Sequence, residues 1–267
     1  MVHFTKMNGA GNDFVMIDNR DLGLHLDREQ IARICDRHRG VGADGVLLVE
    51  PPANGGDFRM RYYNSDGGEA EMCGNGARCF ARFAARLTGR QAPMRFETVA
   101  GSIGAELLGE NVRLQMSDPR SLQLNAKLDL EGKAYAVHSI DTGVPHAVVI
   151  SDDLSSLDIQ TLGAALRNHH HFAPRGTNAN FVMPERRDGI AIRTYERGVE
   201  GETLACGTGV VAGALIFHHL TGVPPPLRVK VRGGEILEVN FEPGGEGVRK
   251  VTLTGPAEFV FEGKLPL

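Results

Sequence analysis

The sequence predicts an α+β fold made of two pseudo-symmetric, duplicated domains, each with a mainly antiparallel sheet around a central helix. Three observations lead to this prediction. Strand-like segments outnumber helical ones, few strands are joined by a helix of crossover length, and one cysteine-containing motif recurs in both halves. The 267 residues give room for two domains of ordinary size.

Short alternating or β-branched segments predict strands along the whole chain. Their polar and apolar residues alternate over stretches too short for a helix. These segments are Phe14–Asp18, Gly45–Glu50, Phe58–Tyr63, Arg95–Thr98, Ile103–Leu108, Val112–Met116, Ala134–Ile140, Ala147–Ile150, Ile190–Tyr195, Leu227–Arg232, Ile236–Phe241 and Phe259–Phe261.

Helix signals are fewer than strand signals. Asp27 and Gln30 form a capping box that begins the first helix, and Gly40 is a candidate for its left-handed end. Two more helices begin after Cys-Gly dipeptides, and each has a glycine just beyond its last turn. The four helices are expected at Arg28–Arg39, Asn75–Thr88, Asp158–Asn168 and Thr208–Leu220.

The duplication is visible in two matching stretches. Arg61-Tyr-Tyr-Asn ends a strand and Glu69-x3-Cys73-Gly-Asn-Gly opens a helix, while Arg193-Thr-Tyr-Glu and Glu202-x3-Cys206-Gly-Thr-Gly repeat the pattern. In both stretches an arginine follows the cysteine after 22 residues, and a glycine follows six residues later. We therefore expect two homologous domains, 1–118 and 119–267, with the last strand a candidate for packing on the first.

A weaker echo links Phe14-Val-Met with Phe181-Val-Met, each just after an asparagine. It suggests that these two segments occupy equivalent places in the two halves. We expect the halves to meet near Ser117–Leu122.

Composition and charge exclude several classes of function. Lys and Arg total 29 against 33 Asp and Glu, so the chain has no basic field for nucleic acid. The apolar stretch Gly209–Phe217 is too short to cross a bilayer, and Lys6, Asp13 and Arg20 interrupt any signal-like run. We expect a cytoplasmic protein that binds neither nucleic acid nor membrane, with four cysteines too few for a disulfide framework.

Cys73 and Cys206 each lie where a glycine-rich segment opens a helix. The unpaired N–H groups and partial positive charge of a helix N-terminus stabilise an anion and lower the pKa of a thiol. Glycines also let the carboxylate of a ligand approach the backbone closely. The N–H groups available for such a carboxylate belong to Gly74, Asn75, Gly207 and Thr208.

If the duplicated domains face each other across a pseudo-two-fold axis, the active site lies in the interdomain cleft. A carboxylate held by both helix ends would place its α-carbon between two sulfurs. One thiolate could then remove the α-proton while the opposite thiol returns one, which inverts the centre. This packing is a hypothesis.

Other residues favour simpler interpretations. Cys35 and Cys79 lie on helix faces and are expected to be core residues. No pair of cysteines or histidines has zinc-ligand spacing with a matching partner, and His169–His171 is expected to be a solvated helix end, so we expect no metal. The glycine-rich Asn8–Asp13 lacks a preceding strand and a following helix; we interpret it as a binding loop, not a dinucleotide fingerprint.

On these motifs the chain closely resembles diaminopimelate epimerase over essentially its whole length. The resemblance rests on the two cysteine motifs and on several polar segments distributed along the chain. They are Asn8-Gly9-Ala10-Gly11-Asn12-Asp13-Phe14, Asn64-Ser65-Asp66-Gly67, Cys73-Gly-Asn-Gly-Ala-Arg78, Pro145-His146, Thr177-Asn178, Glu196-Arg197-Gly198 and Cys206-Gly-Thr-Gly.

The resemblance implies a cofactor-independent isomerase that interconverts LL- and meso-diaminopimelate for lysine and peptidoglycan synthesis, commonly as a homodimer. It also implies that Cys73 and Cys206 form the acid–base pair. His146 and Glu196 would lie beside the thiols and tune their protonation. The distal amino-acid centre, which does not react, would be held by Asn12, Asn64, Asn178 and Arg197.

These roles agree with the chemistry of the residues. Arg197 can pair with a carboxylate through two hydrogen bonds, and an asparagine offers both donors and an acceptor to an ammonium–carboxylate pair. Glu196 can accept from an ammonium. As alternatives, Arg197 and Glu196 could form an exposed ion pair, and Asn64 and Asn178 could be turn formers.

Two positions depart from the family pattern, because Val144 and Gly45 stand where many members have polar side chains. Relative to the first repeat, Glu200 also lengthens the loop before the second cysteine by one residue. The loss at Val144 leaves open a related racemase acting on proline, hydroxyproline or a glutamate-like substrate. A non-catalytic amino-acid-binding protein would need neither thiol, and a dithiol redox protein would need a Cys-x-x-Cys motif that this chain lacks.

Overall fold

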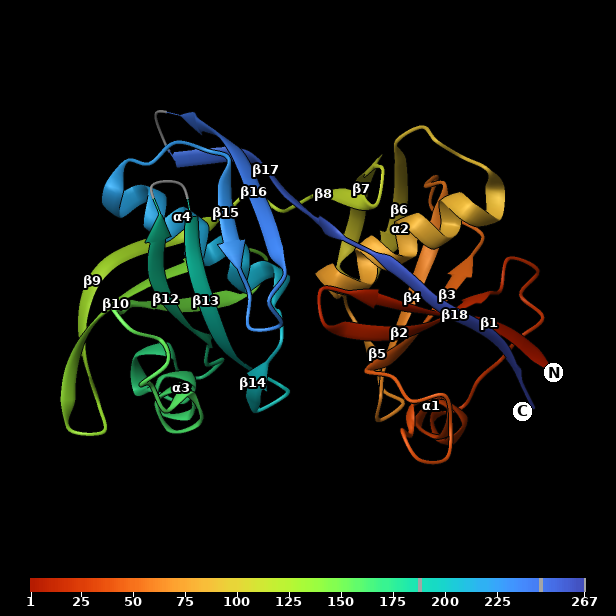
Figure 1. The fold of residues 1–267 in the computed structure, drawn as a ribbon, viewed down its shortest axis with the longest axis horizontal. Helices are drawn as coiled ribbons and strands as arrows, with labels where there is room; N and C mark the ends of the chain where they lie inside the picture. The colour runs from red at the N-terminus through yellow and green to blue at the C-terminus, as the bar shows by residue number, and fades with distance from the viewer. Residues whose placement is uncertain (187–188, 245–246, 267) are drawn as a thin grey trace. The chain divides into compact units, whose positions relative to one another are not determined.

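The computed structural model describes residues 1–186, 189–244 and 247–266, and the chain divides into two compact units (Figure 1). Unit 1 comprises Met1–Gln115 and Thr254–Leu267, and unit 2 comprises Met116–Leu253. The C-terminal strand pairs with the N-terminal strand, so the chain returns to unit 1 at its end (Figure 1). The last strand of the chain thus joins the edge of the sheet that holds the N-terminal strand.

Unit 1 contains one sheet and two helices, α1 (Arg28–Cys35) and α2 (Gly74–Thr88). The short β5 (Glu69–Ala70) pairs with the end of β4. The other strands, in sheet order, are β18 (Glu258–Leu265), β1 (Val2–Gly9), β2 (Asn12–Asp18), β3 (Gly45–Glu50), β4 (Phe58–Asn64), β6 (Met94–Thr98), β7 (Gly101–Leu108) and β8 (Asn111–Gln115).

Unit 2 repeats this arrangement. Its sheet order runs β9 (Arg120–Leu130), β10 (Lys133–Asp141), β11 (Pro145–Ile150), β12 (Asn178–Arg186), β13 (Gly189–Glu196), β15 (Leu227–Lys230) and β16 (Ile236–Gly244). The remaining elements are β14 (Gly201–Thr203), which pairs with β13, β17 (Gly247–Pro256), α3 (Ile159–Arg167), the 3-10 turn His170–Phe172 and α4 (Gly207–Thr221).

Each strand pair of unit 1 with an equivalent described in unit 2 has the same parallel or antiparallel orientation as that equivalent. The parallel pairs are β2–β3 and β4–β6 in unit 1 and β11–β12 and β13–β15 in unit 2, and the other pairs are antiparallel. The ion pairs repeat as well, because Arg61 binds Glu69 and Arg193 binds Glu202. The predicted α+β class with mainly antiparallel, duplicated domains is confirmed.

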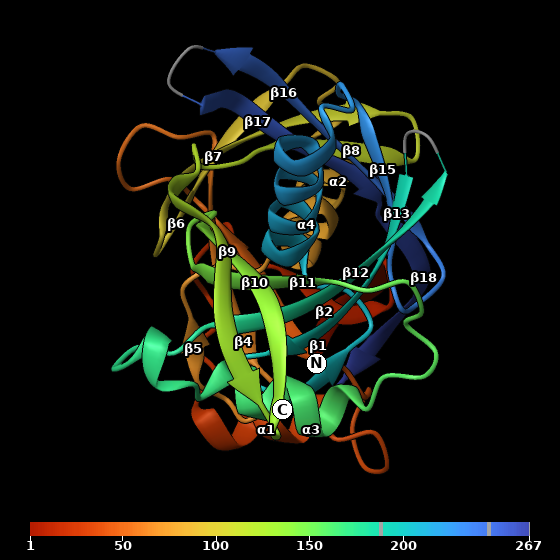
Figure 2. The same ribbon diagram turned by 90° about the vertical axis from the view of Figure 1, so that its left-hand side faces the viewer.

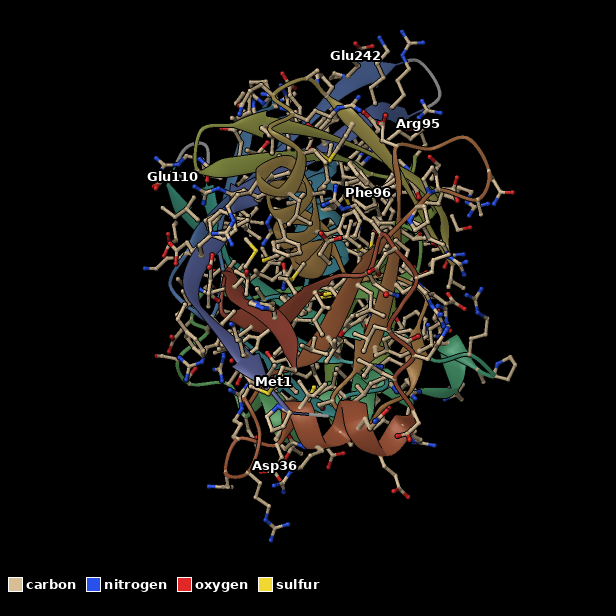
Figure 3. The ribbon with its side chains drawn as sticks, turned by 90° about the vertical axis from the view of Figure 1, so that its right-hand side faces the viewer. Met1, Asp36, Arg95, Phe96, Glu110 and Glu242 are labelled. Atoms are coloured by element: carbon tan, nitrogen blue, oxygen red, sulfur yellow. The ribbon has the colours of Figure 1, made fainter. Side chains whose placement is uncertain are left out.

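Each unit is built around its longest helix. Helix α2 contacts β1, β2, β3, β4, β7 and β8. Helix α4, seen in Figure 2, contacts β10, β11, β12, β13, β15 and β16. Phe80 on α2 packs against Phe96 of β6, with ring centroids 4.7 Å apart. Phe96 is labelled in Figure 3. In α4 every residue from Gly209 to Phe217 is buried, so this helix is apolar on all sides.

Three of the four predicted helices lie where the sequence placed them, within about a residue at each end. Gly89 and Gly222 follow α2 and α4 with φ of 70° and 75°, as expected for left-handed helix ends. The capping box of Asp27 and Gln30 is also present.

The first helix is shorter than predicted. It ends at Cys35 because Asp36 leaves the helical region, with ψ of 119°, and its carboxylate accepts from the N–H groups of His38 and Arg39. Gly40 is not left-handed. The left-handed glycine of this segment is Gly42, with φ of 76°.

The predicted equivalence of Phe14-Val-Met and Phe181-Val-Met is wrong. The first tripeptide lies in β2, which pairs with β1 and β3, whereas the second lies in β12, which pairs with β11 and β13. By this pairing β12 corresponds to β3, and β2 corresponds to β11.

Several strands lack a sequence signal, and each has a reason. The first six residues of β9 are exposed, so they do not alternate, and β5 and β14 have only two and three residues. Strand β1 buries polar side chains such as Thr5 and Lys6. Because β1 precedes Asn8–Asp13, that segment is a β-hairpin turn, and the expectation that no strand precedes it is wrong.

Candidate functional site

Cys73 is the N-cap residue of α2. Its backbone is extended (φ −137°, ψ 119°), and its sulfur lies 3.5 Å from the N–H of Gly76, which donates to it. The side chain is partly exposed. Cys73 therefore lies at the positive end of a helix, where a thiolate is stabilised.

Cys206 holds the equivalent position at the start of α4, with an extended backbone (φ −118°, ψ 109°). It is only 6% exposed, and its sulfur lies 3.6 Å from the hydroxyl oxygen of Thr208. The first turn of α4 is held from outside as well, because the Thr142 hydroxyl donates to the Thr208 carbonyl at 3.0 Å.

A carboxyl group lies beside the second thiol. Burial raises the pKa of Glu196, and hydrogen bonds with Thr203 and Cys206 oppose this increase. Glu196 is the last residue of β13. A carboxyl group with a raised pKa in contact with a thiol can accept its proton and return it near neutral pH.

A chain of amides joins the β1–β2 hairpin to the start of α2. Asn75 donates to the side-chain oxygen of Asn12, which in turn donates to Asp44 at 3.0 Å. The buried Arg78 donates to the Asn75 amide oxygen at 3.0 Å and to the Gly9 carbonyl at 3.3 Å. Two of the predicted substrate-binding residues, Asn12 and Asn75, are thus brought together with Cys73 in unit 1.

Asn64 lies at the exposed end of β4. Its carbonyl accepts from Gly67, and its N–H donates to the Gly68 carbonyl, each at 2.9 Å. Gly67 has φ of 82°, which a turn of this kind requires from a glycine. Asn64 therefore takes part in this turn through its backbone, and the residue is exposed.

An ionic cluster behind the hairpin escaped the sequence analysis. Asp13 pairs with Lys6 at 2.7 Å and with Arg37 at 2.8 Å, and Arg37 also binds Asp44. Burial alone would raise the pKa of Asp13, but the hydrogen bonds and charges of Arg37 and Lys6 outweigh it and lower that pKa. Because Asp44 also holds Asn12, the cluster fixes the position of a predicted binding residue.

In unit 2, Asn178 is buried at the start of β12. Its amide nitrogen donates to the Pro145 carbonyl at 3.3 Å, and its amide oxygen accepts from the Arg197 N–H at 2.8 Å. The Arg197 guanidinium donates to the Arg175 carbonyl, and no carboxylate of the described residues lies within ion-pair distance. The alternative of an Arg197–Glu196 surface ion pair is therefore wrong, and Arg197 keeps donors for a ligand.

His146 is fully enclosed, with 1% of its surface exposed. Its Nδ1 lies 3.1 Å from the amide nitrogen of Asn180. Burial and the positive charge of Arg197 lower the pKa of His146 to about 3, and they outweigh the opposing effect of the hydrogen bond with Asn180. Sequence reasoning missed Asn180, because β12 was not predicted as a strand. A lone asparagine between Ala179 and Phe181 was the available signal.

The other two cysteines are core residues, as predicted. Cys35 is 4% exposed and Cys79 is fully buried, and burial raises the pKa of each thiol to about 12. Such thiols remain protonated near neutral pH and are poor nucleophiles and bases.

The described residues hold neither a cluster of metal ligands nor a membrane-spanning helix. Within the described ranges no three His, Cys, Asp or Glu side chains gather as metal ligands. His169 is the N-cap of the 3-10 turn His170–Phe172, in which His170 and His171 are exposed. Across those same ranges, none of the helices has the length and apolarity needed to span a membrane.

Gly45 leaves no room for a side chain. A Cβ at this position would lie 2.5 Å from the Tyr63 carbonyl and 2.6 Å from the ring of Tyr62. The glycine that departs from the family pattern is therefore matched to the tyrosine packed against it. At Val144 the side chain is half-buried, and its carbonyl accepts from Thr142.

Comparison with known proteins identifies close relatives. The family model described as diaminopimelate epimerase matches residues 4–122 and 138–260. The diaminopimelate epimerase of Aquifex aeolicus is 44% identical, with 99% of this chain and 98% of the relative covered. That of Chlorobaculum tepidum is also 44% identical, with 98% and 100% covered.

Solved structures share the fold at low sequence identity. A probable proline racemase from Agrobacterium radiobacter K84 has a TM-score of 0.75 at 17% identity, covering 100% of this chain and 93% of that one. A phenazine biosynthesis protein of the PhzF family from Bacillus anthracis has a TM-score of 0.74 at 16% identity, covering 100% and 99%. At this identity the likeness concerns the fold alone.

Proposed function

Because this chain belongs to the diaminopimelate epimerase family, we propose that it interconverts LL- and meso-diaminopimelate by two-base proton transfer between thiols. The observation that carries the proposal is the duplicated cysteine at a helix N-cap, Cys73 on α2 and Cys206 on α4. Binding alone would need neither thiol.

The proposed reaction balances without a cofactor. One cysteine thiolate takes the α-proton, and the electron pair of the broken C–H bond is delocalised into the adjacent carboxylate. The other cysteine, as a thiol, then donates its proton to the opposite face of the same carbon. The product carries inverted stereochemistry, and the two sulfurs have exchanged protonation states.

We assign the charge-stabilising groups to the backbone at the two helix starts. The N–H groups at the two N-termini hold the α-carboxylate, where negative charge increases as the α-proton leaves. Glu196 tunes Cys206 through the hydrogen bond described above, and His146 is the second tuning residue. The N–H groups of this proposal are those of Gly74, Asn75, Gly207 and Thr208.

The distal, unreactive amino-acid centre is assigned to polar side chains. Arg197 keeps hydrogen-bond donors for a carboxylate, and Glu196 can accept from an ammonium. Asn12, Asn64 and Asn178 complete this set. A second charged centre on the substrate accounts for these residues, whereas proline has none.

The decisive experiment follows the α-hydrogen in deuterated water. With two bases, meso product formed early from LL substrate contains solvent deuterium, while recovered LL substrate contains little. A single base would carry the original protium to both faces. Early product that retains protium would therefore exclude this mechanism, and absence of turnover without added cofactor would exclude the activity.

Substrate range and assembly complete the proposal. Proline, hydroxyproline and glutamate assayed beside diaminopimelate test whether Val144 and Gly45 relax specificity; we expect turnover of diaminopimelate only. We also propose a homodimer acting in the cytoplasm, as the family resemblance implies. Light scattering of the purified protein should give a mass of twice 28.8 kDa, and a monomer mass would contradict it.

A further inference from the structure

A polar cluster lies beneath the first turn of α4. It consists of His146 on β11, Asn180 on β12 and Thr194 on β13, three neighbouring strands. Asn180 pairs directly with Thr194, and His146 pairs with Asn178, which lies two residues before Asn180 and therefore on the same face of β12. All three are buried, with 1%, 0% and 3% of their surface exposed. Buried polar groups cost free energy unless they are hydrogen-bonded, so the protonation of each can be derived from its partners.

The orientation of the Asn180 amide is fixed by a backbone carbonyl. The Ala147 carbonyl oxygen lies 2.9 Å from one terminal atom of the amide, and a carbonyl can only accept, so that atom is nitrogen. The other terminal atom is therefore oxygen, and it accepts from the Thr194 hydroxyl at 3.0 Å. No other assignment satisfies both neighbours.

This orientation determines the tautomer of His146. The Asn180 amide nitrogen lies 3.1 Å from Nδ1 and can only donate, so Nδ1 must carry the lone pair. A neutral imidazole with its lone pair on Nδ1 carries its proton on Nε2. Burial together with the charge of Arg197 keeps the ring neutral, as its lowered pKa indicates.

The Nε2–H group is then a buried donor, and no described residue accepts from it. Leaving such a donor unsatisfied is costly, which indicates that its acceptor arrives with a ligand. We propose that Asn180 is a positioning residue that holds His146 as a neutral Nε2–H donor for an anionic group of the bound substrate. The proposal rests on the proposed function, since it concerns the same site.

The cluster is also in contact with the turn that carries the second thiol. A Cβ added at Gly209 would lie 2.5 Å from the Asn180 amide oxygen and 3.4 Å from the sulfur of Cys206. The amide oxygen and the sulfur therefore flank the same glycine of α4. A displacement of Asn180 would be transmitted to both His146 and Cys206.

The first experiment measures the tautomer directly by NMR of protein carrying nitrogen-15 histidine, with His146→Gln used to assign the resonances. We expect Nδ1 of His146 unprotonated and Nε2 protonated from pH 8 to pH 5. We also expect the Nε2–H resonance to shift when diaminopimelate is added. A protonated Nδ1, a charged ring at pH 7 or an unmoved resonance would overturn the proposal.

The second experiment replaces the donor. Asn180→Asp keeps the shape and the acceptor for Thr194 but offers His146 a carboxylate, so the proton should move to Nδ1 and the pKa of His146 should rise. We expect kcat to fall by between about tenfold and a hundredfold, the cost of misplacing a catalytic group, with KM changed less than about twofold. Unchanged kcat in a folded Asn180→Asp protein would contradict the positioning role.

Thr194→Ser is the matched control, because it keeps the hydroxyl that orients Asn180 and should leave tautomer and kcat unchanged. If Asn180→Asp fails to fold, the wild-type measurement decides by itself. The two proposals fail differently. The predicted tautomer in a protein that does not epimerise diaminopimelate would exclude the function, whereas an active enzyme with Nδ1 protonated would exclude the role of Asn180.

Discussion

The N-termini of α2 and α4 have similar backbone conformations, but apolar side chains pack beneath the first and polar side chains beneath the second. Under α2 lie Phe14, Leu47 and Tyr62, with the rings of Phe14 and Tyr62 in edge contact at 6.1 Å. Under α4 the equivalent sheet positions hold His146, Asn180 and Thr194. Duplication has therefore preserved the cysteine and its helix, while the supporting side chains have diverged from apolar to hydrogen-bonded.

The residues beside the two thiols differ in the same way. The sequence position that holds Asn64 after the first strand motif holds Glu196 after the second. Asn64 is exposed in a turn, whereas Glu196 is partly buried and hydrogen-bonds with Cys206. Two different environments can give the two thiols different pKa values. One thiol is then favoured as the base and the other as the acid for a given direction of the reaction.

The largest expected effect comes from removing either thiol. Cys73→Ala and Cys206→Ala should each lower the epimerisation rate by about 10²- to 10⁴-fold or more, because one face of the α-carbon loses its acid or base. The far-ultraviolet circular dichroism should not change. Appreciable epimerisation by either variant would contradict the two-thiol assignment.

Cys35→Ala and Cys79→Ala are the controls for that comparison. Both side chains are buried core residues and neither is a helix N-cap, so activity should persist while the free energy of unfolding falls through small cavities. Urea unfolding measures this loss. Inactive but folded controls would show that alanine at any cysteine perturbs the site.

Replacing a glycine by alanine in the first turn of each helix compares the side chains that pack beneath Cys206 with those that pack beneath Cys73. Gly209→Ala places a Cβ 2.5 Å from the Asn180 oxygen, whereas Gly76→Ala places one 3.1 Å from the flexible end of Leu47. Gly209→Ala should therefore lower kcat by up to about a hundredfold, and Gly76→Ala by much less. Steady-state kinetics of the two variants decide, and equal losses would remove the distinction between the supports.

The buried polar cluster of His146, Asn180 and Thr194 also predicts that the fold loses stability in acid. His146 has a folded-state pKa of about 3, below the 6.5 of an unperturbed histidine, so the unfolded state binds the proton first as the pH falls. The free energy of unfolding should therefore decline from pH 6.5 towards pH 3, by up to about 1.4 kcal/mol per pH unit from this residue.

The double substitution His146→Phe and Asn180→Leu gives unit 2 the apolar side chains that unit 1 has at the equivalent positions, Phe14 and Leu47. The double variant should lose activity but show a shallower decline of unfolding free energy between pH 6.5 and pH 4. Denaturant unfolding across this range provides the measurement. A slope as steep as that of the wild type would mean that another group causes the acid sensitivity.

The smallest expected effect concerns the residue inserted in the second loop. Glu200 is exposed, has φ of 57°, caps the Gly198 N–H at 3.1 Å and pairs with Arg167 at 3.0 Å. Glu200→Ala should lower the free energy of unfolding by about 1 kcal/mol, the usual size of such contacts. Thermal unfolding measures it, and a change above several kcal/mol would show that the loop organises the unit.

Local sequence determined the elements whose signals are local. The capping box at Asp27, the glycines after α2 and α4, and the repeated spacing around Cys73 and Cys206 each depend on residues a few positions apart. Helix ends and N-cap cysteines could therefore be placed from the sequence alone. The duplication followed because two copies of one pattern share one spacing.

Tertiary structure decided what depends on distant residues meeting. Asn180 acquires its role only when β12 lies between β11 and β13, and Gly45 is required only because Tyr62 packs across from it. Strand β9 is placed by pairing and not by alternation. Hydrogen bonds and close packing join residues far apart in the chain, so the tautomer of His146 and the partner of Cys206 could not be derived from sequence spacing.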